Sequence, residues 1–521
     1  MSSKLDLDQG MIEDCRAAAI QIAAVVGEQI AAKTSVSVER TTTRLLGVDG
    51  ANELEVPLPN VLVDHLRERG ELHRGVAYWL GNALVQEPQR APLQIAQAVA
   101  EGALDLCALP TAPTEAIRER VLGECEGRLD EIAGRMESRR ELRDALGESP
   151  PPLRYVLTAT GNVYEDVVHG LAVAEAGGDI VAVIRSTAQS LLDYVPYGPT
   201  TEGYGGTFAT QANFRIMRAA LDDWSARNGR YVRLSSFCSG LCMPEIAAMG
   251  AIEGYDNMVN DALYGILYRD INIVRGLIDQ RSSRMVNGYF GVVINTGEDN
   301  YLRTAEALSA APSVTASQFI NRQLARDSGV PDEQIALGDA FEIEPSVVNS
   351  LLYEWAQAQL TRELFPECPV KYMPPTRHMD GNLYRTHATD SLFNLVTIAT
   401  SQGIQTIGVP TEGIFTPHVH DRVIGLENVN YTFAAARDLG DEIEFKRGGI
   451  IQRRAQEVLA GAHELLAQIA EEGLFAALAR GVFGDVCRRV DQGRGLDGVV
   501  DVDEHYLNPV SELMGRTSSL A

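Results

Sequence analysis

The sequence predicts a closed (β/α)8 barrel with helical accessory segments at both ends. Seven short β-branched runs alternate with helix-length stretches through the middle of the chain, a pattern typical of parallel strands joined by helices. The proline-rich stretch GESPPPLR (147–154) separates this pattern from a helix-rich beginning. From Gly449 onward the chain is helical again. We therefore expect an N-terminal, mostly helical region (1–150), a barrel (151–447) and a C-terminal helical region (448–521).

The first region contains amphipathic helical patterns. In MIEDCRAAAIQIAAVVGEQIAAK, helical spacing places a set of apolar residues near one face, where we expect them to pack against the rest of the protein. These residues are Ile12, Ala19, Ile20, Ala23 and Ile30.

The predicted barrel strands follow in order. They are RYVLTAT, DIVAVIR, YVRLSSF, YFGVVINT, IALGDAF, PVKYMPP and QTIGVPT. An eighth strand is either irregular or formed by DEIEFKR (441–447). An open doubly wound sheet is the alternative, but a closed barrel explains the regular alternation better.

Composition restricts the classes of function. The net charge of −26 argues against nucleic-acid binding, which needs a basic surface. The chain has no long apolar run of membrane-spanning type, and its polar, acidic N-terminus resembles no secretory signal, so we expect a cytoplasmic protein. The seven dispersed cysteines are typical of reduced core thiols.

In such a barrel, chemistry is expected at the carboxyl ends of the strands. After the second predicted strand, Arg185 stands among hydroxyl residues and no GxxxxGK[ST] motif is present, which favours a small phosphomonoester such as that of pyridoxal phosphate. Lys371 is the only lysine between Lys33 and Lys446. From the residues alone, Lys371 would be the lysine that forms a Schiff base with this cofactor.

Two metal hypotheses are disfavoured. Cys238 and Cys242 have the first spacing of a radical iron–sulfur motif, but Glu245 stands where its third cysteine is required. The segment PHVHD offers His418 and His420, but it follows the last clear strand, whereas such pairs in barrels usually lie on an early one. We expect no metal site.

Several long segments resemble the α subunit of lysine 5,6-aminomutases. They are RSTAQSLLDYVPYGPTTEGYGGTFATQANFRIMR, SSFCSGLCMPEIAAMGAIEGYDNMVNDALYGILYRDIN, INTGEDNY and CPVKYMPPTRHMDG, with VERTTTRLLGVDG near the start and EEGLFAALARGVFGDV near the end. The resemblance covers nearly the whole chain. It implies a pyridoxal-phosphate-binding (β/α)8 barrel in an enzyme that also requires adenosylcobalamin. It further implies a smaller β subunit that holds cobalamin and carries the Schiff-base lysine, in an α2β2 assembly.

The resemblance also implies residue roles. Arg185 and Ser190 match phosphate contacts, Ser239 matches a residue that hydrogen-bonds the cofactor ring, and Tyr264 matches the tyrosine that stacks on the pyridine. Arg269 matches an arginine at cofactor and substrate. Asp299, Asn300 and Lys371 match residues that orient substrate charges and cofactor oxygens, and the Schiff-base role passes from Lys371 to the partner subunit.

The activity implied is a radical 1,2-shift that moves the terminal amino group of D-lysine or β-lysine from carbon 6 to carbon 5. Three alternatives remain. The first is an ornithine 4,5-aminomutase, although that family joins barrel and cobalamin domain in one longer chain. The second is a stand-alone pyridoxal phosphate barrel, such as a racemase, with Lys371 as its Schiff-base lysine. The third is a non-catalytic binding subunit.

Overall fold

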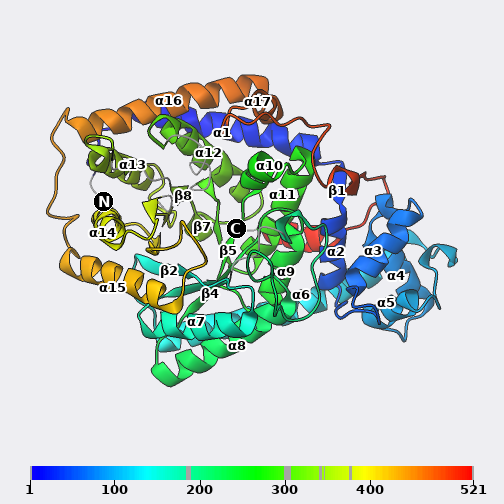
Figure 1. The fold of residues 1–521 in the computed structure, drawn as a ribbon. Coiled ribbons are helices and arrows are strands. Elements are labelled where there is room, and N and C mark those ends of the chain that lie inside the picture. The colour runs from blue at the N-terminus through cyan, green and yellow to red at the C-terminus, as the bar shows by residue number, and fades with distance from the viewer. Residues whose placement is uncertain are drawn as a thin grey trace.

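A computed structural model describes residues 3–183, 189–298, 307–339, 343–344, 346–374 and 378–518. Its centre is a parallel sheet that closes on itself (Figure 1). In sequence order the strands are β2 (Leu153–Leu157), β3 (Ile180–Val183), β4 (Arg233–Phe237), β5 (Asn257–Val259), β6 (Val293–Asn295), β7 (Ile335–Ala336), β8 (Gly338–Asp339), β9 (Lys371–Tyr372) and β10 (Ile404–Thr406).

The short pieces β7 and β8 close the barrel. They belong to one stretch of chain interrupted at Leu337, and β7 pairs with β6 whereas β8 pairs with β9. The sheet therefore behaves as eight strands in a ring, because β10 pairs with β2 on the other side. The predicted (β/α)8 barrel is confirmed, and the alternative of an open doubly wound sheet is wrong.

All seven predicted strands are present. Of the two expectations for the eighth strand, the one that placed it at DEIEFKR (441–447) is wrong. The segment 441–447 contains no strand. The strand that the sequence did not indicate is β5, which lies between β4 and β6 in the sheet. β5 is only three residues long and is bordered by Asp256 and Asn260. A strand this short shows no alternating pattern, and its pairing with β4 and β6 supplies what its sequence does not indicate.

Helices follow the strands and cover the outside of the barrel. They are α7 (Val163–Glu175), α8 (Gln211–Asn228), α9 (Met243–Glu253), α10 (Ala262–Arg269), α11 (Ile273–Tyr289), α12 (Ala307–Arg326), α13 (Ser350–Leu364), α14 (Leu383–Ala399) and α15 (Val419–Ala435). Inside the barrel, alternate strand residues such as Tyr155, Ile180 and Ala336 form a separate small apolar cluster. The alternation follows from the two-residue period of a strand.

The N-terminal region is helical, as the sequence predicts. It contains α1 (Gln9–Ile30), β1 (Lys33–Ser35), α2 (Val36–Leu45), α3 (Leu58–Glu68), α4 (Val76–Gln86), α5 (Pro92–Ala100) and the long α6 (Thr114–Leu146). On α1, four of the five expected core residues are buried, but Ile20 is 54% exposed. Ile20 follows the buried Ala19 directly, and one residue turns a helix by about 100°. The core stripe instead includes Cys15, Ile22 and Val26.

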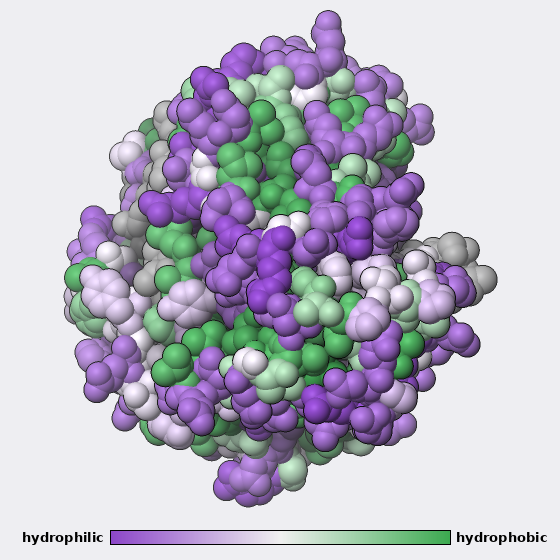
Figure 2. Space-filling model, turned by 90° about the vertical axis from the view of Figure 1, so that its right-hand side faces the viewer, coloured by the Kyte–Doolittle hydropathy of each residue, from purple (hydrophilic) through white to green (hydrophobic). Residues whose placement is uncertain are grey.

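The two ends of the chain meet on the outside of the barrel. The C-terminal region contains α16 (Ile450–Glu472), α17 (Leu474–Arg480), β11 (Val499–Asp501) and α18 (Pro509–Ser518). In Figure 1, α1 runs beside α16, and β1 pairs with β11 in a small antiparallel sheet. Figure 2 shows a mostly hydrophilic face broken by separate hydrophobic patches. Among the described residues, no helix combines the length and apolar character needed to cross a membrane.

Candidate active site

Three neighbouring connections bring predicted site residues together at one edge of the barrel. Ser190 lies in a 3-10 turn after β3, Ser239 follows β4, and Tyr264 lies on α10, which follows β5. Because β3, β4 and β5 are adjacent parallel strands, their carboxyl ends meet at the same edge. Ser190 and Ser239 are both buried, whereas Tyr264 is half-buried.

Gly240 permits the close approach of these connections. Its φ of +79° is unfavourable for residues with a side chain, and a Cβ there would lie 2.6 Å from the carbonyl oxygen of Ser190. The N–H of Leu241 donates to that same oxygen at 3.0 Å. A Cβ on Gly265, the residue after Tyr264, would lie 3.6 Å from the Cα of Gly240. The Ser190, Ser239 and Tyr264 segments therefore pack against one another through backbone.

Tyr264 and Arg269 form a pair on α10. The carboxylate of Asp261 caps this helix by accepting from the N–H groups of Leu263 and Tyr264 at 2.9 and 3.0 Å. One turn later, Arg269 Nη2 donates to the Tyr264 hydroxyl at 2.9 Å, and its guanidinium carbon lies 5.1 Å from the centre of that ring. A flat aromatic face thus lies beside a cation.

Lys371 lies inside the barrel. It begins β9, which stands opposite β4 in the ring, and it is only 6% exposed. Its Nζ is 5.3 Å from the ring centre of Tyr155, whose hydroxyl lies 3.2 Å from Ser235 Oγ. A buried ammonium at the face of a tyrosine is stabilised by the ring quadrupole. Lys371 therefore points into the barrel from the side facing the Ser239 segment. The predicted site residues Arg185, Asp299 and Asn300 lie outside the described residues.

Three residues near the site, Tyr155, Asp261 and Glu298, are not among the predicted site residues. Tyr155, beside Lys371, occupies an ordinary strand position, and no local pattern separates it from a core aromatic. Glu298 is buried at the end of β6 and accepts from the Gly338 N–H at 3.0 Å. Burial raises the pKa of Glu298, a hydrogen bond from Thr296 opposes this effect, and the carboxylate of Asp261 adds to it. Asp261, at the N-cap of α10, and Glu298 are thus two buried acidic residues whose charges repel each other.

The residues of the disfavoured metal hypotheses have local partners. Cys238 Sγ donates to the Met243 carbonyl at 3.0 Å, and His418 stands at the N-cap of α15. In the described part of the chain, one group of potential metal ligands lies close together, namely His65, Asp105 and Cys107. It is far along the chain from the site, and Arg69 already pairs with its carboxylate at 3.2 Å.

Comparison with known proteins gives one consistent result. Residues 5–513 match the family model described as the D-lysine 5,6-aminomutase TIM-barrel domain of the alpha subunit. The lysine 5,6-aminomutase alpha subunit of Acetoanaerobium sticklandii is 51% identical over 514 residues, covering 99% of both chains. Its counterpart from Fusobacterium nucleatum is 51% identical over 512 residues, covering 98% of this chain and 99% of the relative.

A more distant relative is the D-ornithine 4,5-aminomutase subunit beta of Acetoanaerobium sticklandii. It is 28% identical over 382 residues, which cover 70% of this chain and 51% of that subunit. The identity with the lysine enzymes is therefore higher and extends over the full length. The chain belongs to the family of D-lysine 5,6-aminomutase alpha subunits, whose TIM-barrel domain it contains.

Proposed function

We propose that the chain is the barrel subunit of a lysine 5,6-aminomutase that uses pyridoxal phosphate and adenosylcobalamin. The reaction would move the terminal amino group of D-lysine or β-lysine from carbon 6 to carbon 5. The observation that carries this proposal is the convergence of Ser190, Ser239 and Tyr264 at the carboxyl edge of three adjacent strands. We assign cofactor and substrate to the barrel (151–447), with accessory segments at 1–150 and 448–521.

The described residues fit pyridoxal phosphate. The hydroxyls of Ser190 and Ser239 suit a phosphate and a ring oxygen, and the absence of a side chain at Gly240 lets their two segments approach each other closely. The half-buried ring of Tyr264 offers a flat face for a pyridine at small entropic cost. Arg269, fixed through the Tyr264 hydroxyl, presents a cation to an anionic ligand.

Roles in the reaction follow from these positions. When bound, pyridoxal phosphate supplies a carbonyl for the terminal amine, and adenosylcobalamin supplies the initiating radical. Tyr264 and Arg269 would hold the cofactor ring and the substrate near it, while Lys371 would neutralise an anionic group from inside the barrel. We retain Arg185 and Asn300 as cofactor contacts and Asp299 as a substrate contact. The barrel wall excludes water from the reacting groups.

Exposed apolar residues on the β-to-α connections and at the start of α14 support a docking surface for the partner subunit. They surround the edge at which the site lies and follow β3, β8, β9 and β10: Tyr194, Tyr197, Tyr204, Val348, Leu383, Tyr384, Ile414 and Phe415. Tyr204 and Tyr384 are 85% and 92% exposed. Apolar side chains gathered around a site edge are typical of an interaction surface. We propose that a cobalamin-binding β subunit, which carries the Schiff-base lysine, covers this edge in an α2β2 assembly in the cytoplasm.

Reductive fixation tests the proposal against the racemase alternative. Purified chain is incubated with pyridoxal phosphate, treated with borohydride with and without the β subunit, and the modified lysine is mapped by mass spectrometry. We expect fixation only when the partner is present, and on the partner's lysine. Fixation on Lys371 in the isolated chain would support a stand-alone enzyme instead.

Turnover then identifies the substrate. We expect adenosylcobalamin-dependent conversion of D-lysine or β-lysine by the two-subunit complex, and slower or no conversion of D-ornithine. Preference for D-ornithine would support the ornithine alternative, and no turnover in a complex that binds both cofactors would support a binding role.

A further inference from the structure

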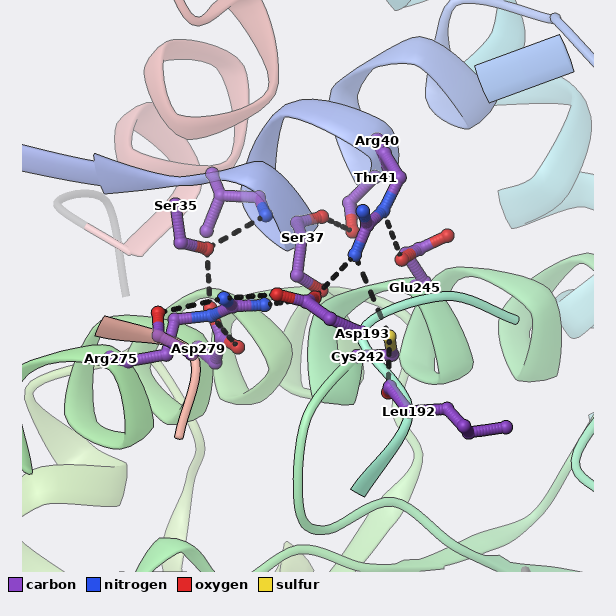
Figure 3. A network of polar contacts seen from close by, with 12 residues as sticks. Ser35, Ser37, Arg40, Thr41, Leu192, Asp193, Cys242, Glu245, Arg275 and Asp279 are labelled. Atoms are coloured by element: carbon purple, nitrogen blue, oxygen red, sulfur yellow. Dashed lines mark hydrogen bonds and ion pairs between the residues drawn. The ribbon is translucent and has the colours of Figure 1, made fainter. Parts of the chain in front are cut away.

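A buried polar network joins the accessory helix α2 to the connection that carries Ser190. We call it the Asp193 network, and its members are Ser35, Arg40, Asp193, Glu245, Arg275 and Asp279 (Figure 3). Arg40 Nη2 donates to Asp193 Oδ1 at 2.7 Å, and Arg40 Nε donates to Glu245 Oε1 at 2.7 Å. Arg40 thus links the β3–α8 connection to α9.

Asp193 receives a second arginine from the barrel. Arg275 on α11 donates through Nη2 to Asp193 Oδ1 at 2.6 Å and through Nη1 to Oδ2 at 2.8 Å. Its Nε donates to Asp279 Oδ2 at 2.8 Å, and Nη1 also donates to the Gly495 carbonyl at 3.2 Å. Four parts of the chain therefore meet at Asp193: the accessory helix α2, the β3–α8 connection, the barrel helix α11 and the C-terminal region.

The burial of the arginines holds Asp193 in place. Arg40 is 3% and Arg275 0% exposed, whereas Asp193 is 30% exposed. If Asp193 moved away, two guanidinium groups would lose a counter-charge in a place that water hardly reaches, which is strongly unfavourable. Burial alone raises the pKa of Asp193, but Arg275 and Arg40 outweigh it and hold the pKa well below its ordinary value. Asp193 is therefore charged at neutral pH.

This anchor lies three residues after Ser190. Before it, the side-chain amide of Gln189 exchanges two hydrogen bonds with the backbone of Ala209, at 3.0 and 2.6 Å. The Ser190 carbonyl accepts from Leu241. The turn that contains Ser190 is thus held on one side by Gln189 and on the other by Asp193. The position of the Ser190 hydroxyl depends on both.

We propose that Asp193, held by Arg40 and Arg275, is a positioning residue for the phosphate group of the cofactor. Asp193 itself makes no contact with the cofactor in this proposal; it fixes the turn that presents Ser190. The accessory helix α2 thereby sets the affinity of the barrel for a phosphate-bearing cofactor. The inference rests on the proposed function, because it takes Ser190 as a phosphate contact.

The test compares pyridoxal phosphate with pyridoxal, which lacks the phosphate. Both are titrated spectrophotometrically into the full chain in complex with its β subunit, as wild type and as Asp193→Asn. We expect the Kd of pyridoxal phosphate to rise about tenfold in the variant, while the Kd of pyridoxal changes by less than about twofold. If the ratio of the Kd of pyridoxal phosphate to the Kd of pyridoxal is the same in the variant as in the wild type, the proposal is overturned.

Asp222 provides a matched control. It lies on α8, is 29% exposed and also pairs with two arginines, Arg139 and Arg218, at 2.7 Å each. Asp222→Asn should lower thermal stability and leave the ratio of the two constants at the wild-type value. Should Asp193→Asn not fold, Arg40→Lys replaces it, since this variant keeps a cation but loses the planar fork. The Kd of pyridoxal phosphate should again rise relative to the Kd of pyridoxal. Failure of the wild type to bind pyridoxal phosphate would instead contradict the proposed function.

Discussion

At the scale of single residues, Tyr264 combines two contributions that substitution can separate. Its ring is the proposed stacking surface, and its hydroxyl accepts from Arg269 at 2.9 Å. We expect Tyr264→Ala to raise the Kd of pyridoxal phosphate about tenfold or more, because the flat contact is lost. Tyr264→Phe keeps the ring and should raise it by only about threefold. Equal effects of both variants in a spectrophotometric titration would show that the ring face is not the contact.

Gly240 is the second residue whose role can be tested alone. Alanine there would suffer from the φ of +79° and would press against the Ser190 carbonyl. We expect Gly240→Ala to reduce the free energy of unfolding by about 1–2 kcal/mol and to weaken pyridoxal phosphate binding. Gly229 is the control, since its φ is +64° but its Cβ would meet nothing within 4 Å.

Denaturant titration and cofactor titration together decide the result. Gly229→Ala should lose only the stability that its positive φ costs, which is less than the loss in Gly240→Ala, and should leave cofactor affinity unchanged. If Gly240→Ala also leaves the affinity unchanged, contact between its connection and Ser190 does not matter for the cofactor.

The residues differ in how far the sequence could predict them. Ser190, Ser239 and Tyr264 lie in long segments that resemble a known family, and the structure places them at one edge. Lys371 stands out because lysine is scarce in this chain. Tyr155 and Asp193 have no such signal, since their partners Lys371, Arg40 and Arg275 are distant in sequence and only the fold brings them near.

At the scale of elements, strand prediction succeeded where a run was long enough to show its apolar residues. It failed for β5, whose three residues are defined by pairing with β4 and β6. It also failed at 441–447, where apolar and charged residues alternate without a partner strand. Alternation marks a strand only if an edge is free to receive it, and the ring of the barrel is already complete without this segment.

Arg422 joins elements at the place where the barrel begins and ends. From α15 it donates through Nε to the Leu157 carbonyl of β2 and through Nη1 to His169 Nδ1 of α7, both at 2.6 Å. Because Nδ1 accepts this bond, His169 must be neutral. Burial lowers the pKa of His169 to about 4, and the charge of Arg422 adds to this effect.

The lowered pKa predicts a pH dependence of stability. Between about pH 6.5 and 4 the unfolded chain binds a proton at His169 that the folded chain does not, so this contribution to stability is lost as pH falls. We expect the Tm to decrease from pH 7 to pH 5, and His169→Gln, which can still accept from Arg422, to decrease less. Identical pH profiles of Tm for both proteins would contradict the assignment.

At the scale of the whole molecule, the two ends of the chain complete one another. Glu39 on α2 is fully buried, and its carboxylate accepts from Thr34 Oγ1 at 2.7 Å, from the Val76 N–H at 2.7 Å and from the Tyr506 hydroxyl at 2.8 Å. Tyr506 belongs to the C-terminal region, so a donor from one end of the chain satisfies a buried acid from the other. Burial raises the pKa of Glu39, and these donors oppose that effect.

This dependence predicts that the ends unfold together with the barrel. Tyr506→Phe removes one donor from a buried carboxylate and should reduce the free energy of unfolding by about 1–3 kcal/mol. Tyr431 on α15 is 77% exposed, and Tyr431→Phe should have no measurable effect. In differential scanning calorimetry we expect a single transition for wild type and both variants, shifted to lower temperature only for Tyr506→Phe. A separate early transition in Tyr506→Phe would mean that the accessory segments unfold independently of the barrel. The contact of α2 with Asp193 could then not determine the affinity of the barrel for the cofactor.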